Sequence, residues 1–166
     1  MEIRQLDIDD AQNYLSLRLE ALQNSPYAFA SSYEEEKDDS AEKYRVRFHT
    51  AKNSFTFGAF KGTQLAGVIT LVREQKMKLK HRANIVAMYV KPEERGNGIG
   101  KALIHQAIQK ARSMGGIEQL YLTVVTSNEA AKKLYSSMGF EVFGREEKAL
   151  KIDDVYYDEA WMVLFL

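Results

Sequence analysis

A strand-like run passes into a helix-like run through the stretch Val90-Lys91-Pro92-Glu93-Glu94-Arg95-Gly96-Asn97-Gly98-Ile99-Gly100-Lys101. Every second residue from Gly96 to Gly100 is a glycine, which adopts backbone angles closed to other residues and places no side chain between a ligand and the amides. The run from Ala102 to Arg112 has apolar residues at helical spacing, so the loop leads into a helix N-terminus, where free amides bind anions. The stretch therefore predicts a pyrophosphate cradle for a phosphorylated ligand.

The spacing of the glycines excludes two better-known phosphate loops. A dinucleotide-binding G-x-G-x-x-G counted from Gly96 has Lys101 in place of its third glycine. A P-loop G-x-x-x-x-G-K-[ST] has Ala102 in place of its hydroxyl residue and Arg95 in place of its first glycine. A nucleotide-binding domain of another type is therefore disfavoured, and the pattern that remains is R-x-x-G-x-G after a Val-x-Pro.

A second motif follows a strand-like run that ends at Asn128. The residues that form the pattern N-x-x-A-x-x-x-Y-x-x-x-G-F are Asn128, Ala131, Tyr135, Gly139 and Phe140. Together with R-x-x-G-x-G, and in this order between Ile85 and Phe143, the pattern resembles the two signatures of the GCN5-related N-acetyltransferase (GNAT) family. Two signatures in the right order are far more specific than a lone glycine motif.

This resemblance implies acetyl-CoA as co-substrate, no metal, and direct acetyl transfer to an amine in a ternary complex. It also implies that two parallel strands splay beyond the loop, so that their unpaired amides hold the pantetheine arm and one near Val90 stabilises the thioester oxyanion. The expected cofactor contacts are Met88, Val90, Arg95, Gly96, Asn97, Gly98, Ile99, Gly100, Lys101, Asn128 and Tyr135. The chain has no cysteine, in agreement with a reaction that has no covalent enzyme intermediate.

Tyr135 is the predicted catalytic residue. A phenol with a pKa near ~10 stays protonated at neutral pH and can protonate a thiolate whose conjugate acid lies near ~8.5. The resemblance assigns it the same role, although a helix tyrosine outside these motifs would more often only pack. Asn128 fits both an N-cap and a contact with the pantetheine amide, and Gly139 is expected to end the Tyr135 helix in a left-handed turn.

Charged residues near the loop have a functional and a plainer interpretation. Arg95 opens the R-x-x-G-x-G pattern and is taken as a ligand contact, whereas loop charges are usually just solvated. Lys101 is expected to contribute mainly its backbone amide. The basic stretch from Arg73 to Arg82 is interpreted as a solvated hairpin tip, and a binding patch for an acidic substrate is the lesser interpretation.

No general base is evident, because the strand from Asn84 to Val90 contains no carboxylate at the place where many members of the family have a glutamate. A water chain, Glu34 or Tyr33 are the candidates for this role. The missing glutamate also leaves open a non-catalytic acyl-CoA-binding regulatory module. Measurable turnover separates the two functions.

The acetyl acceptor is expected to be a small-molecule amine or a peptide. Its contacts should come from outside the signatures, in the segment Ser25 to Ser40 and in the hairpin Lys151 to Asp158. The residues in these parts that suit a cationic amine are Phe29, Tyr33, Tyr156, Tyr157, Asp153, Asp154 and Asp158. Ordinary loop composition is an equally good explanation of them.

Composition narrows the class of protein further. The 166 residues are 45% hydrophobic and fit one domain, residues 1–166. Equal numbers of acidic and basic residues give zero net charge, so no overall field favours nucleic acid or an anionic membrane. The N-terminus resembles no signal peptide and no run spans a bilayer, which predicts a cytoplasmic protein. The apolar end Trp161 to Leu166 fits a core strand or, less simply, a homodimer contact.

The hydrophobic pattern predicts an α/β (α+β) fold. Short strands alternate with two early helices, and a strand, glycine loop, helix and strand then form a crossover unit. The expected elements are strands 3–6, 55–60, 65–72, 83–90, 120–127, 141–150 and 156–166, and helices 11–23, 41–49, 102–112 and 129–138. We therefore expect a mixed, mostly antiparallel central sheet of about six to seven strands flanked by helices.

Overall fold

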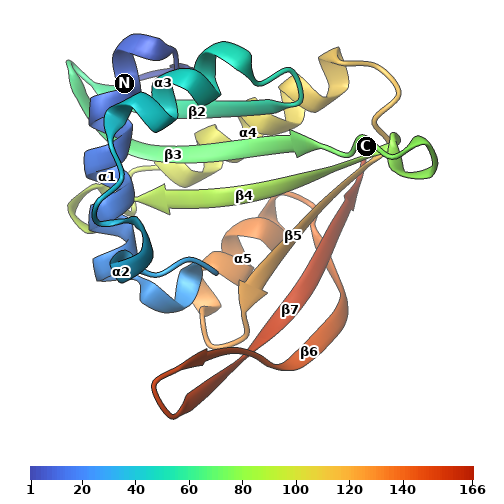
Figure 1. Ribbon diagram of the computed structural model, residues 1–166. Coiled ribbons are helices and arrows are strands. Elements are labelled where there is room, and N and C mark those ends of the chain that lie inside the picture. The colour runs from blue at the N-terminus through green and yellow to red at the C-terminus, as the bar shows by residue number, and fades with distance from the viewer.

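A seven-stranded sheet of order β1-β2-β3-β4-β5-β7-β6 runs through the computed structural model, which describes residues 1–166 (Figure 1). The strands are β1 (Glu2–Gln5), β2 (Ser54–Lys61), β3 (Gln64–Arg73), β4 (Arg82–Val90), β5 (Gln119–Val125), β6 (Glu141–Ile152) and β7 (Val155–Phe165). The helices are α1 (Ala11–Asn24), α2 (Tyr33–Glu36), α3 (Ala41–Thr50), α4 (Ile99–Ser113) and α5 (Glu129–Ser137). The predicted mixed, mostly antiparallel sheet is confirmed.

The first four strands form the expected antiparallel meander, and β4 pairs with β5 in parallel. The segment from Ser25 to Ser40 is less irregular than expected, because it contains the one-turn helix α2. Ser32 caps this helix: its hydroxyl accepts from the amide of Glu35, whose carboxylate accepts in turn from the amide of Ser32. One turn is too short for a hydrophobic period, and the only local signal of this helix is the capping-box spacing of Ser32 and Glu35.

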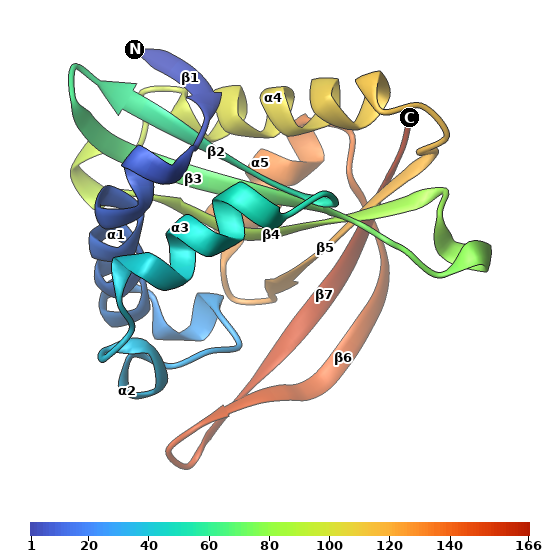
Figure 2. The same cartoon turned by 45° about the horizontal axis from the view of Figure 1, so that its top comes forward.

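Two hydrophobic clusters cover the two faces of the sheet, with α4 and α5 over one face and α1 and α3 over the other (Figure 2). Strand β3 contributes side chains to both clusters, since Ile69 lies in the cluster under α4 and Val68 lies in the cluster under α1. Helix α4 buries Leu103, Ile104 and Ala107 completely on its sheet side. This packing fixes the position of the helix N-terminus relative to the strands.

Strands β4 and β5 diverge soon after they meet, as Figure 1 shows. Their pairing is limited to Arg82–Asn84 against Gln119–Tyr121. Further along β4, the register with β3 shifts, and Ala87 takes a φ of +51°, an unusual angle for a residue with a side chain. The side of β4 that faces β5 therefore has no ladder partner beyond Asn84, as the predicted splay requires.

Strand β7 lies between β5 and β6, so the apolar C-terminal stretch is a core strand, as expected. Ala160 and Met162 are buried under α4 and α5. The long β6–β7 hairpin carries its turn away from the body of the molecule (Figures 1 and 2). Close to this turn the hairpin contacts the segment after α1, because the ring of Tyr157 stacks on Tyr27 with centroids 6.0 Å apart.

Candidate active site

The glycine loop presents a row of free amides at the start of α4. None of the backbone N–H groups from Gly96 to Lys101 donates a hydrogen bond within the chain, and no side chain caps the helix. Gly96 and Gly98 have positive φ angles of 79° and 78°, and a Cβ at either position would meet nothing within 4 Å. Free amides at the positive end of a 15-residue helix, in front of open space, fit a pyrophosphate.

Gly100 differs from the other two glycines of the loop. It lies inside α4 and has no positive φ, so the expectation of an unusual backbone angle is wrong for this residue. A Cβ there would lie 2.9 Å from Leu134 Cδ2 and 3.3 Å from Met88 Cε. The absence of a side chain at Gly100 thus allows α4 to approach α5 and β4 closely.

The polar side chains of the loop are exposed. Arg95 donates from Nε to the carbonyl of Val90 at 3.0 Å, and its guanidinium lies 5.7 Å from the ring centroid of Tyr89. Asn97 turns back onto the carbonyl of Glu94 at 3.4 Å and does not line the pocket, so only its amide is available to a ligand. Lys101 lines the pocket from the first turn of α4.

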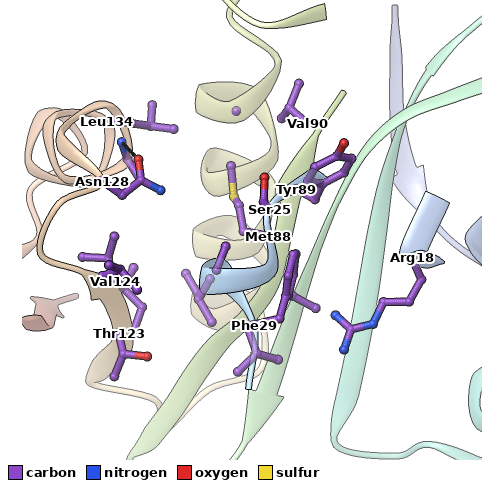
Figure 3. A pocket seen from close by; sticks show the side chains of 18 of the residues that line it. Arg18, Ser25, Phe29, Met88, Tyr89, Val90, Thr123, Val124, Asn128 and Leu134 are labelled. Carbon is purple, nitrogen blue, oxygen red and sulfur yellow. Dashed lines mark hydrogen bonds between the residues drawn. The ribbon is translucent and has the colours of Figure 1, made fainter. Parts of the chain in front are cut away.

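A single large pocket of about 900 Å³ runs from this loop through the gap between β4 and β5 to the segment after α1. Figure 3 shows Thr123, Val124 and Asn128 on one side of it and Met88 on the other. Every residue predicted from the sequence to contact the cofactor lines this pocket, apart from Asn97. The sequence motifs therefore converge on one site.

Tyr135 lines the pocket from α5 and is 7% exposed. Its ring packs edge-on against Phe140, with centroids 6.0 Å apart, and its hydroxyl makes no hydrogen bond within the chain. Burial raises the pKa of this phenol to about 12, because the anion is poorly solvated there. The hydroxyl is thus protonated at physiological pH and free to donate to a ligand.

Asn128 and Gly139 mark the two ends of α5. The side-chain oxygen of Asn128 accepts from the amide of Ala131 at 3.1 Å, which confirms the N-cap, while its Nδ2 makes no hydrogen bond within the chain (Figure 3). Gly139 has a φ of +94°, and the amide of Phe140 returns to the carbonyl of Tyr135 at 3.1 Å. Gly139 therefore ends the helix as expected.

The far end of the pocket contains an ion pair that the sequence did not reveal. Arg18 of α1 binds both carboxylate oxygens of Glu36, at 2.9 and 2.8 Å, and its guanidinium lies 4.8 Å from the ring centroid of Phe29. The hydrogen bonds from Arg18 lower the pKa of Glu36 to about 2. Glu36 is therefore ionised and already occupied, and it is a poor candidate for a proton acceptor.

The residues considered as a general base do not reach the pocket. Glu34 is exposed and pairs with Lys37, and Tyr33 does not line the cavity either. The single turn of α2 directs Glu36 inward instead.

Glu159 is a pocket carboxylate that sequence reasoning missed. It lies on β7 opposite Val125, is half-buried, and has no hydrogen-bond or ion-pair partner. Burial raises the pKa of its carboxyl group, and the neighbouring carboxylate of Glu146 raises it further. The only available signal was a glutamate beside the apolar run that begins at Ala160.

The acidic hairpin residues do not belong to the pocket. Asp153 and Asp154 are exposed in the β6–β7 turn, and Asp158 pairs with Arg145. None of them lines the cavity: Asp153 and Asp154 lie beyond it in the turn, and the side chain of Asp158 is directed to β6. Of the aromatic and acidic acceptor contacts expected there and in the segment after α1, only Phe29 lines the pocket, so that expectation is otherwise wrong.

A row of free amides at a helix N-terminus, opening into the gap of a splayed mixed sheet, is the arrangement expected of an acyl-CoA-dependent acyltransferase. The sequence profile of the Acetyltransferase (GNAT) family matches residues 17–140, so the chain belongs to this family. An acetyltransferase of the GNAT family from Streptococcus pneumoniae has the same fold, with a TM-score of 0.87 and 22% identity over 99% of both chains. A structure of yncA from Salmonella typhimurium with acetyl-CoA aligns with a TM-score of 0.87 and 18% identity, over 100% of this chain and 94% of that one.

A curated relative is similar along most of its length. Spermidine N(1)-acetyltransferase of Thermoplasma acidophilum is 29% identical over 152 residues, which cover 86% of this chain and 89% of the relative. The expected activity, that of an acetyl-CoA-dependent N-acetyltransferase, is confirmed at the level of the family. No helix combines the length and the apolar character needed to cross a membrane, and no three His, Cys, Asp or Glu side chains gather where they would hold a metal ion.

Proposed function

We propose that residues 1–166 form one catalytic domain that transfers the acetyl group of acetyl-CoA to a primary amine of a small molecule or peptide, by direct attack in a ternary complex. The observation that carries this proposal is a continuous pocket, which joins six free amides at one end to Tyr135 and then to a polar chamber under α1 and α3. The names of the relatives support an amine acceptor: one is a spermidine N(1)-acetyltransferase, and another, 38% identical over 63 residues, is N-alpha-acetyltransferase RimI.

Each part of the pocket has a role in this proposal. The amides of the loop bind the pyrophosphate, with Arg95 and Lys101 supplying positive charge at its rim. Backbone groups of β4 at Met88 and Val90, together with Nδ2 of Asn128, hold the pantetheine arm. Acetyl-CoA supplies an activated acyl group, and Tyr135 donates a proton to the departing thiolate.

Glu159 is the proton acceptor in this scheme, since Glu36 and Glu94, the other carboxylates of the pocket lining, are paired with Arg18 and Lys61. Replacing Glu159 by glutamine should lower kcat/KM about 20-fold, a modest loss because water can also remove the proton. The pKa of Glu159 is raised, so in the wild type kcat/KM should rise with pH through a value above that of an ordinary glutamate as the carboxyl group ionises. Glu159→Gln should lose this rise.

The matched control for Glu159→Gln is Glu146→Gln on the neighbouring strand. Glu146 faces Glu159 across the β6–β7 pair and does not line the pocket. This variant should keep kcat/KM and move the rise to lower pH, because a repelling charge is removed. If kcat/KM rose with pH in the same way in Glu159→Gln and in the wild type, Glu159 would be excluded as the base.

The experiment that tests the proposed function is thiol release from acetyl-CoA against amines, amino acids, polyamines and peptides, with acetyl-CoA binding followed by calorimetry. Binding and turnover with an acceptor are expected. Binding without turnover of any amine would instead favour the non-catalytic acyl-CoA-binding module. The missing carboxylate on β4 suggested that alternative, and the position of Glu159 in the pocket lining supports the transferase instead.

A further inference from the structure

We propose that the acceptor carries an anionic group, a carboxylate or a phosphonate, and that Arg47 binds it. The inference rests on the proposed function and narrows its acceptor to amines that also bear a negative charge, rather than polyamines. The acceptor end is the part of the pocket lined by α1 and α3, with Arg18, Lys43 and Arg47 as its cations. Arg47 is the one of these that has no carboxylate partner.

The contacts of Arg47 leave three of its five guanidinium N–H donors unused. Its Nη2 donates to the hydroxyl groups of Tyr14 and Thr56, each at 3.2 Å. Its Nε and Nη1 donate to nothing in the chain and are not buried, and the residue lines the pocket. Three N–H donors of a permanently charged group thus lack an acceptor.

Aromatic rings hold this guanidinium in place. It lies 5.2 Å from the ring centroid of Tyr14, 5.5 Å from that of Tyr44 and 5.6 Å from that of Phe48. Tyr14 and Tyr44 are almost completely buried, so the side chain is supported by rigid neighbours. A guanidinium that is oriented before binding loses little entropy when it pairs with an anion.

Apart from Arg47 and Glu159, the charged side chains near this part of the pocket are paired within the protein. Arg18 is bound to Glu36, and Lys43 is bound to Asp39 at 2.6 Å. Glu159 and Arg47 are left, one negative and one positive. An amine with an anion at its other end matches both, whereas a second ammonium group of a polyamine would meet the unpaired charge of Arg47 in a partly desolvated chamber.

The test compares pairs of acceptors that differ in one charge: amino acids with their carboxamides, and aminoalkylphosphonates with the corresponding alkylamines, with spermidine as a further acceptor. Rates are compared per concentration of neutral amine, because the amide raises the acidity of the ammonium group. The wild type should prefer the anionic member of each pair by about 30-fold in kcat/KM. A preference for spermidine or for the uncharged members would overturn the inference.

The variant Arg47→Gln should lose that preference. Its kcat/KM should fall about 30-fold for the anionic acceptors and change little for the uncharged ones, with the same Kd for acetyl-CoA. Arg45→Gln is the matched control, since Arg45 is exposed on the same helix, pairs with Glu42 and does not line the pocket. A merely structural Arg47 would lower the rates with both kinds of acceptor equally, and that result would overturn the inference.

The two proposals fail in different ways. Turnover of uncharged amines alone would refute the anionic acceptor and leave the transferase intact, whereas binding of acetyl-CoA without turnover of any amine would refute both. The wild-type comparison of acid with amide does not depend on how Arg47→Gln folds.

Discussion

Tyr135→Phe should lower kcat about 10²- to 10³-fold and change the Kd for acetyl-CoA by no more than about threefold. The substitution removes one oxygen from a ring that keeps its packing against Phe140, so the fold and the shape of the pocket stay the same. What is lost is the hydroxyl that we propose as the proton donor. Steady-state thiol release gives kcat, and calorimetry gives the affinity for acetyl-CoA.

The raised pKa of Tyr135 is compatible with this role. Burial raises the pKa of the Tyr135 phenol to about 12, because an anion is poorly solvated there. A thiolate that leaves in the same place also becomes more basic, for the same reason. Because the phenol ionises only around that pH, kcat should show no alkaline decline from Tyr135 below about pH 10.

Tyr121→Phe is the control for Tyr135→Phe. The hydroxyl of Tyr121 donates to Gln119 at 2.6 Å on β5, outside the pocket. This variant should keep wild-type kcat. Full activity in Tyr135→Phe would remove Tyr135 from the chemistry and leave it as a packing residue.

The order of the elements could be predicted from the sequence because it depends on local patterns. Alternating residues mark the strands of the meander, and the glycine loop followed by an apolar helix marks the crossover. Other features depend on distant neighbours. Ala87 takes a positive φ although it is not glycine, since β4 bulges against β3, and no local pattern predicts such an angle.

The candidate site divides in the same way. The half that faces acetyl-CoA comes from two contiguous motifs, so its residues could be named from the sequence. The half proposed to bind the acceptor is assembled from elements far apart in the chain, with Arg18 on α1, Arg47 on α3 and Glu159 on β7. Each is an ordinary charged residue in its own segment, and only the fold shows which of them have a partner.

Gly98→Val should weaken acetyl-CoA binding about 100-fold, which is the loss expected when one or two charge-assisted hydrogen bonds to the pyrophosphate are broken. Gly98 caps α4 with a φ of 78° and a ψ of 2°, a left-handed conformation that a β-branched residue adopts only under strain. Valine must either rotate the backbone, which turns the first amides of α4 away, or project its side chain in front of them. Calorimetry with acetyl-CoA measures the change.

Gly62→Val is the control that separates the loss of acetyl-CoA binding from the loss of stability that backbone strain causes anywhere in the chain. Gly62 has a φ of +60° in the turn between β2 and β3, a Cβ there would meet nothing within 4 Å, and the residue does not line the pocket. Both variants should lose about 1–3 kcal/mol in the free energy of unfolding, measured with urea. Only Gly98→Val should lose affinity for acetyl-CoA, because only Gly98 lies among the free amides at the start of α4. Equal Kd values in the two variants would mean that the loop does not bind the pyrophosphate.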